Sequence, residues 1–280
     1  MATVGKLLRG RVRGRIGFDA GQITVEQFRT LRRAAGPRVR LSAAHGEISS
    51  LRQRKDPAEI AQMRKAALLA DEVVAAAFKL LKPGVREIEV AAEIEYQMRS
   101  RGASGPAFQT IVAFGARSAH PHARPTEKRL GKNELVVLDL GVILGHYCSD
   151  ITRTVFVGRA PARIRGWYRA VQEAQAAAVA AVKGGATCGE VDAAARDVLK
   201  RYRLDRYFVH STGHGLGLEV HEDPRVARGQ KHVLVPGNVI TIEPGVYVPG
   251  VGGIRIEDDV AVHAGRTEVL TRVPRDLIEI

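Results

Sequence analysis

Two histidines lie seven positions apart in residues 211–224, STGHGLGLEVHEDP, and a neutral imidazole is a common metal ligand. The glycines are spaced G-x-G-x-G with no helix opening behind them, unlike a dinucleotide-binding loop. Arg225 stands where a zinc-protease helix needs its second histidine after His221, and Ser211 lacks the turn context of a nucleophilic serine. The segment therefore supplies one imidazole, from His214, to ligands elsewhere, or its histidines are ordinary surface or core residues.

Acidic residues interrupt four apolar, strand-like segments, in which burial of a carboxylate is costly unless it is paired or metal-bound. They are Asp139, Asp150, Glu243 and Glu257. A turn near Gly145 predicts that the two aspartates lie on neighbouring antiparallel strands and share a cation. In the alternative reading, Asp150 pairs with Arg153 and Asp139 caps a bend.

Four embedded carboxylates with one imidazole form the kind of ligand set that a pair of divalent ions requires, since carboxylate oxygens can bridge two ions. Glycines around His214 would let backbone and substrate approach closely. The residues alone thus favour a dinuclear metal centre.

Helices and strands must bring these residues together. Asp56 followed by Pro57 predicts a helix start, and apolar residues at three- and four-residue steps continue to Leu81 before Pro83-Gly84. The patterns predict further helices at 86–100, 161–183 and 189–201, and strands at 110–114, 135–143, 152–157, 233–248 and 253–263.

The pattern restarts once along the chain. KPGVREIEVAAEI from Lys82 aligns with KGGATCGEVDAAA from Lys183, 101 positions later. Such a repeat predicts an α+β fold with two similar halves, each with two helices and an antiparallel sheet, and a site in the cleft between them. Coincidence between two alanine-rich helices is the alternative.

The ordered ligand set and its neighbours resemble the pita-bread (creatinase/aminopeptidase) family of dinuclear metallopeptidases, which includes methionine aminopeptidase, aminopeptidase P and prolidase. The resemblance covers about residues 55–280 and rests on HARPTE, STGHGLGLEVHE, IEPGVYV and GIRIEDD. The segment PHARPT and Arg255 make the chain more similar to the proline-directed members. The resemblance implies a pita-bread fold and hydrolysis of the bond between an N-terminal residue and proline.

The resemblance also implies a role for each matched residue. Asp139 and Asp150 would bind one ion, with Asp150 bridging; His214 and Glu243 would bind the other, and Glu257 would bridge both. Glu243 would also shuttle the catalytic proton. The substrate-contacting histidines would be His122, His210 and His221, and Arg255 would orient the substrate or brace neighbouring carboxylates. The two ions would be manganese, with cobalt or zinc as alternatives.

Residues 1–54 are expected to be the remnant of a creatinase-type N-terminal domain with its linker, and residues 55–280 the catalytic domain. Residues 1–54 carry +9 of the total net charge of +13. We interpret this excess as incidental basic surface and expect no nucleic-acid partner, because no aromatic residues interleave with the charge. The short N-terminal segment leaves homodimerisation open.

Composition is that of a globular protein, with 45% apolar and 26% charged residues. No stretch reaches the length of a membrane span, and two distant cysteines, Cys148 and Cys188, fit a reducing cytoplasm. Other readings are a related metal-dependent amide or amidine hydrolase, a methionine aminopeptidase-like enzyme, and a non-catalytic binding module. The intact ligand set argues against the last.

Overall fold

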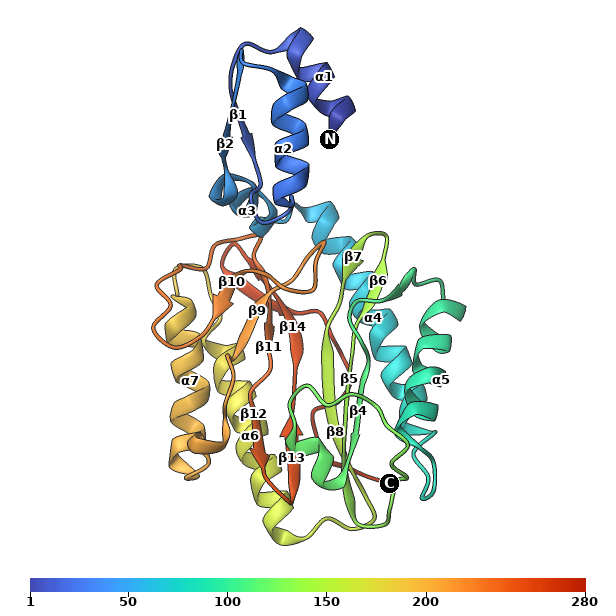
Figure 1. Ribbon diagram of the computed structural model, residues 1–280. Coiled ribbons are helices and arrows are strands. Elements are labelled where there is room, and N and C mark those ends of the chain that lie inside the picture. Colours follow the sequence, from blue (N-terminus) through green and yellow to red (C-terminus); the bar gives the residue numbers. More distant parts are fainter. The chain divides into compact units, whose positions relative to one another are not determined.

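The computed structural model describes residues 1–280, except the side chain of His45, and the chain forms two compact units, Met1–Arg52 and Gln53–Ile280. Among the described residues, none of the helices combines the length and the apolar character needed to cross a bilayer. Figure 1 shows the elements of each unit.

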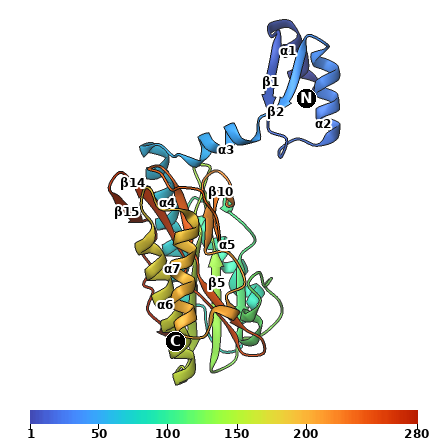
Figure 2. The same cartoon turned by 90° about the vertical axis from the view of Figure 1, so that its left-hand side faces the viewer.

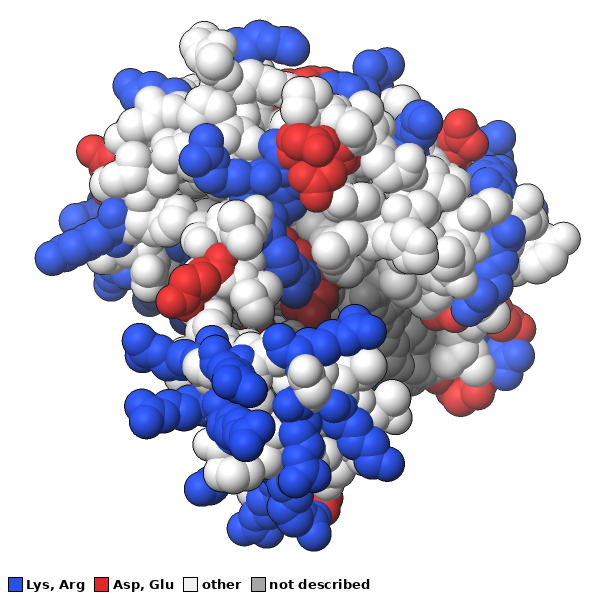
Figure 3. Space-filling model, turned by 90° about the horizontal axis from the view of Figure 1, so that it is seen from above, with Lys and Arg blue, Asp and Glu red and all other residues white. Residues whose placement is uncertain are grey.

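The first unit contains α1 (Ala2–Arg11), β1 (Gly14–Phe18), α2 (Val25–Ala35) and β2 (Val39–Ala43), with β1 and β2 parallel; α3 (His45–Gln53) follows. Helix α2 begins at a capping box formed by Thr24 and Gln27. The sequence patterns did not predict α1, whose Gly5 packs closely against Ala34 of α2. In residues 1–52, Lys and Arg outnumber Asp and Glu eleven to three. Figure 3 shows a dense group of basic side chains with few acidic ones.

The second unit contains two helix pairs that cover its strands. They are α4 (Pro57–Phe78) with α5 (Glu87–Ser100), and α6 (Ala162–Ala181) with α7 (Cys188–Arg201). Asp56 caps α4 by accepting from the N–H groups of Ala58 and Glu59, as its sequence predicted. Figure 1 shows one pair at each flank of the strands, and Figure 2 shows α6 and α7 side by side.

The strands of this unit are β3 (Gly105–Pro106), β4 (Ile111–Phe114), β5 (Glu134–Leu140), β6 (Val142–Leu144), β7 (Tyr147–Cys148), β8 (Ile151–Val157), β9 (Gly213–Gly215), β10 (Glu222–Val226), β11 (Val239–Ile242), β12 (Gly245–Val248), β13 (Gly252–Arg255), β14 (Asp258–His263), β15 (Arg266–Val269) and β16 (Ile278–Glu279). They pair in the orders β16-β8-β5-β4, β10-β9-β11-β14-β15, β12-β13 and β3-β6-β7. Short 3-10 helices, η1 (Gly115–Ala119) and η2 (Asp205–Tyr207), complete the unit.

The predicted repeat is present in the structure. Both ends of α7 lie 101 positions after the corresponding ends of α5. An isolated bridge precedes each helix, Arg86 with Arg129 and Thr187 with Val233. One apolar core lies under α4 and α5 with β5 and β8, and another lies under α6 and α7 with β11 and β14. The expectation of two similar α+β halves is therefore confirmed.

Three predicted strands were too long, and the segment 135–143 breaks at Gly141, between β5 and β6. The segment 233–248 has an isolated bridge at Val233 and becomes a strand only at Val239, because the turn at Pro236-Gly237 interrupts it. That segment and 253–263 each break in the middle, after Ile242 and after Arg255. Glu243 and Glu257 thus lie in the gaps between strands, not inside them, and both gaps occur at the same level because β11 pairs with β14 and β12 with β13.

Candidate metal centre

Both aspartates of the predicted ligand set lie on the sheet of the first half. Asp139 is in β5, where its partner across the antiparallel pair is Thr152 of β8. Asp150 directly precedes β8, beyond the turn at Gly145 and the short pair β6–β7. The prediction of neighbouring antiparallel strands is therefore confirmed, and both carboxylates are buried.

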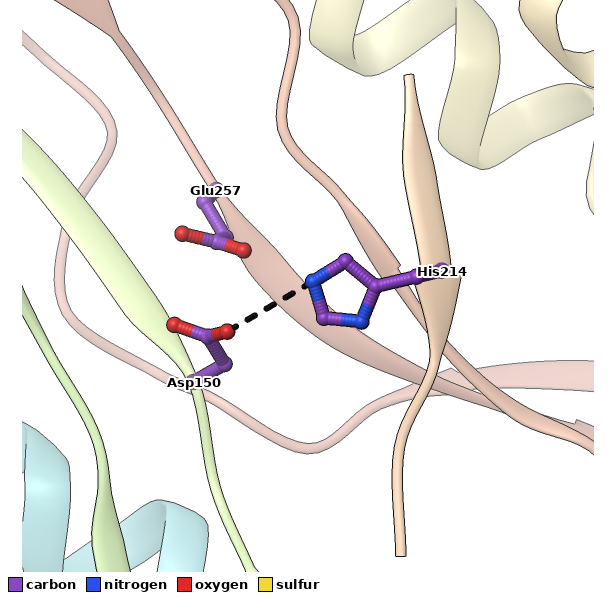
Figure 4. A group of neighbouring side chains, drawn as sticks. All are labelled: Asp150, His214 and Glu257. Atoms are coloured by element: carbon purple, nitrogen blue, oxygen red, sulfur yellow. Dashed lines mark ion pairs between the residues drawn. The ribbon is translucent and has the colours of Figure 1, made fainter. Parts of the chain in front are cut away.

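The other three predicted ligands come from the second half. His214 is in β9, and Glu243 and Glu257 occupy the two strand gaps. His214 Nε2 lies 3.7 Å from Asp150 Oδ2 and 3.4 Å from Glu243 Oε1. One ligand atom each of Asp150, His214 and Glu257 lies within 4.8 Å of the others. Figure 4 shows these three side chains, from separate segments of the chain, pointing toward one another. The cluster therefore joins residues from both halves.

Burial and mutual repulsion raise the pKa of Asp150, Glu243 and Glu257. For Asp150 and Glu257 the main cause is loss of water, followed by the charges of neighbouring acids, with Asp139 among them for both. Burial raises the pKa of Glu243 to about 7, with Arg255 opposing the shift and Asp139 adding to it. The charge of Asp139, the fourth predicted acidic ligand, adds to the shift at each of these three carboxylates. A site with such crowded negative charge favours cations.

Two oxygen atoms of the cluster have no hydrogen-bond partner among the described residues, Asp139 Oδ1 and Asp150 Oδ1. A buried carboxylate oxygen without a partner is costly, and a cation would remove that cost. The alternative pairing of Asp150 with Arg153 is wrong, because the Arg153 guanidinium pairs with Asp258 at 2.8 Å. The donor set of carboxylates and one imidazole therefore fits divalent ions.

The orientation of His214 suits a ligand role. Its Nδ1 lies 3.0 Å from the carbonyl oxygen of Gly215. A carbonyl only accepts, so Nδ1 carries the proton and the unprotonated Nε2 faces the carboxylates. Burial is the main cause that lowers the pKa of His214, which keeps the ring neutral. Its neighbours Gly213 and Gly215 are required because a Cβ there would overlap the backbone of Thr241 and of Asp223.

The three histidines expected to contact substrate differ in environment. His221 is exposed, with its ring centroid 4.3 Å from that of His214. His122 is exposed on the loop after η1. Its electrostatic interaction contributes to lowering the pKa of His210, His221 and Glu243. His210 is half-buried, and both of its ring nitrogens have partners at 2.8 Å, the carbonyl of Ser211 and the hydroxyl of Tyr247. Burial above all, then Arg255, lowers the pKa of His210 to about 3.

Arg255 is buried and braces the cluster. Its Nη2 donates to Asp139 Oδ2 at 2.5 Å, its Nε to Thr152 Oγ1 at 2.9 Å, and its Nη1 to Tyr247 Oη at 2.6 Å. Of the two roles considered for this arginine, these contacts support bracing of carboxylates. They leave one oxygen of Asp139 for a cation.

Sequence reasoning missed two residues of this network. Thr152 donates to Glu257 Oε2 at 2.5 Å while it accepts from Arg255, and Tyr247 links Arg255 to His210. The available signal for Thr152 was its position opposite Asp139 in the expected strand pair, which places it beside the same site.

Known proteins resemble this chain over most of its length. The model of metallopeptidase family M24 matches residues 61–264. A curated Xaa-Pro dipeptidase from Pyrococcus furiosus is 48% identical over 231 residues, which is 82% of this chain and 66% of that protein; its counterpart from Pyrococcus horikoshii is 46% identical with the same coverage. The chain thus spans about two thirds of the length of these curated relatives.

Solved structures extend the likeness to nearly the whole chain. A prolidase from Pyrococcus furiosus superposes with a TM-score of 0.90 at 40% identity, covering 98% of this chain and 80% of that one. An X-Pro aminopeptidase from Thermotoga maritima has a TM-score of 0.94 at 33% identity, covering 100% of this chain and 79% of that one. The chain therefore has the expected pita-bread fold.

Proposed function

Because the chain belongs to metallopeptidase family M24, we propose that it is a metal-dependent exopeptidase that hydrolyses the bond between an N-terminal residue and proline. The observation that carries this proposal is the buried to half-buried cluster of four carboxylates and His214, in which two carboxylate oxygens have no partner among the described residues. Relatives that are Xaa-Pro dipeptidases by name support proline as the second residue of the substrate.

We assign the metal ligands as the sequence predicted. Asp139, Asp150, His214, Glu243 and Glu257 would together hold the divalent ions. When bound, divalent ions supply Lewis acidity that activates water and polarises the scissile carbonyl. Manganese is the first choice because most of the ligands are oxygen atoms, with cobalt and zinc as alternatives.

The protein's own residues would then move the proton and stabilise charge. Glu243 would take a proton from the attacking water and deliver it to the proline nitrogen, because its carboxylate faces the cluster next to His214 Nε2. The exposed histidines, His122 and His221, would donate to the carbonyl oxygen as negative charge develops there. His210 would reach substrate only by exchanging one of its two present partners.

Arg255 would act through the ligands. Its charge offsets part of the crowded negative charge, and its contact with Asp139 fixes which oxygen is offered to a cation. The buried cysteines Cys148 and Cys188, both unpaired, support a reducing compartment such as the cytoplasm.

A panel of three substrates tests the proposal on protein loaded with manganese: the dipeptide Ala-Pro, the tripeptide Ala-Pro-Ala and the tripeptide Met-Ala-Ser. We expect release of proline from Ala-Pro. Cleavage of Ala-Pro-Ala at the same bond would identify an aminopeptidase acting on longer peptides. Cleavage of Met-Ala-Ser alone would identify the methionine aminopeptidase-like activity, and a metal-loaded protein inactive on all three would favour the amide or amidine hydrolase.

A further inference from the structure

A buried carboxylate holds both ends of the loop that carries His122. Glu87, the first residue of α5, is fully buried and accepts from the N–H of Phe114 at 2.9 Å and from the N–H of Thr126, also at 2.9 Å. It also accepts from Thr126 Oγ1 at 2.6 Å and from the Nε of Arg117 at 3.1 Å. Since residues 114 and 126 lie on either side of His122, one side chain fixes the segment between them.

A second buried carboxylate holds the segment that carries His210. Asp192 of α7 accepts from Thr212 Oγ1 at 2.7 Å and from the Nε of Arg196 at 2.7 Å. Arg196 in turn donates to the carbonyl oxygens of Phe208 at 3.2 Å and His210 at 2.6 Å. Three alternate residues, 208, 210 and 212, are therefore tied to one face of α7.

The two arrangements use the same chemistry at related places in the fold. Each has a buried carboxylate near the start of the second helix of its half, an arginine whose Nε binds it, and a threonine hydroxyl. In each, the arginine also donates to a carbonyl of the histidine-bearing segment: Arg117 to Arg124 at 2.7 Å, and Arg196 to His210. In the first half the arginine is in η1, within the histidine-bearing segment, and in the second half it is on helix α7.

We infer that these two carboxylate–arginine–threonine clamps, Glu87–Arg117–Thr126 and Asp192–Arg196–Thr212, are positioning devices that set the places of His122 and His210. The clamps would change the reaction only through the segments that they hold. The effect on turnover rests on the proposed peptidase function, whereas the effect on the histidine rings does not.

Each clamped segment also bonds to the stretch from Glu243 to Arg255, which contains β12 and β13. The carbonyl oxygen of Thr212 accepts from the N–H of Glu243 at 2.8 Å. In the other half, Ser118 Oγ accepts from the N–H of Gly253 at 2.8 Å, and Pro121 O lies 3.4 Å from Nη1 of Arg255. Displacement of either segment would therefore reach the site as well as its own histidine.

Isosteric Thr→Val changes test the inference without removing a buried charge. Thr212→Val deletes the hydroxyl that Asp192 accepts, and Thr126→Val deletes the one that Glu87 accepts. Thr267→Val, on β15, is the matched control. It deletes a hydroxyl that donates to the carbonyl oxygen of Val182, and Thr267 contacts none of the histidines named above. Thermal unfolding of each variant confirms that it is folded.

The first readout is the NMR signals of the histidine rings in metal-free protein. We expect Thr212→Val to shift the signals of His210 and Thr126→Val those of His122, while His263, paired with Glu268 on another part of the sheet, stays unchanged. Thr267→Val should leave His122 and His210 unshifted. Unshifted signals in both clamp variants would overturn the inference whatever the substrate is.

The second readout is the turnover of Ala-Pro. We expect kcat to fall by about tenfold or more with KM changed less than about threefold, as displaced catalytic groups produce. In a His210→Ala background, Thr212→Val should lower kcat by a smaller factor than in the wild type, because part of its effect acts through His210. Full additivity in that background would identify a merely structural threonine. Wild-type protein that leaves Ala-Pro intact would contradict the proposed function and leave the NMR result to decide the clamps.

Discussion

Glu243→Gln should make the metal-free protein more stable at pH 8, although it removes a residue of the active site. The pKa of Glu243 rises from its ordinary 4.5 to about 7, mainly because the carboxylate is buried. A group with a raised carboxyl pKa costs the folded state stability as pH rises from 4.5 through 7, since the folded protein must give up a proton that it holds more tightly. The glutamine variant has no such group to ionise.

The size of the effect follows from the shift. A rise from 4.5 to about 7 corresponds to roughly 3 kcal/mol at pH 8. For a chain of this size that free energy moves the melting temperature by roughly 5–10 °C. The difference between the variant and the wild type should therefore be near zero at pH 4.5 and reach this size at pH 8.

Calorimetric unfolding in the presence of a chelator, at pH 4.5, 6 and 8, measures the difference. Glu268→Gln is the control of opposite sign. Hydrogen bonding to Arg64 lowers the pKa of Glu268 to about 2, so its contribution is present above 4.5 and is lost as pH falls toward 2. That variant should be less stable than wild type at pH 8. Adding manganese should stabilise the wild type more than Glu243→Gln, because ligand binding to the folded state adds stability.

A wild type as stable as Glu243→Gln at pH 8 without metal would refute the reasoning. It would mean that the Glu243 carboxylate is hydrated or neutralised in the folded protein, despite its burial. A stability difference independent of pH would also contradict it, because packing changes do not titrate.

Further substitutions test the roles of two histidines, the contacts of Arg255 and the close packing at Gly213. His214→Ala should lose bound metal, measured by elemental analysis, whereas His221→Ala should keep the metal and lose about 100-fold in kcat, as removal of one charge-stabilising donor does; equal metal loss in both would contradict the assignment. Arg255→Lys should lower kcat at unchanged metal content, because lysine cannot reproduce the three contacts; full activity would contradict bracing. Gly213→Ala should lower the melting temperature strongly, since its Cβ would overlap Thr241, and an unchanged melting temperature would show that the strands separate easily.

The repeated helix pairs were predictable because their signals are local. Each such signal spans only a few residues, as the helix cap at Asp56 and the Pro-Gly stop at Pro83 do. The strand gaps at Glu243 and Glu257 were not, because alternation of apolar and polar residues continues through Pro244 and Ile256 although the pairing changes there from one ladder to the next. The break is visible only once both strands are placed.

The ligand types were readable because a carboxylate in an apolar strand is costly wherever the strand lies. Their supporting contacts were not readable from one sequence. Arg255 reaches Asp139 across 116 positions, and Thr152 reaches Glu257 across 105. Helix α1 was missed for a different reason: its first turn lacks acids, its N-cap lacks a side-chain hydrogen bond, and it depends on packing against α2.

Metal titration against turnover tests the central claim most directly. Protein stripped with a chelator should release no proline from Ala-Pro, and activity should rise with added manganese and level off at about two ions per chain. Glu243→Gln, titrated in parallel, should show no turnover at any manganese concentration. Proline release from the stripped protein, or no release after two ions have bound, would contradict the account.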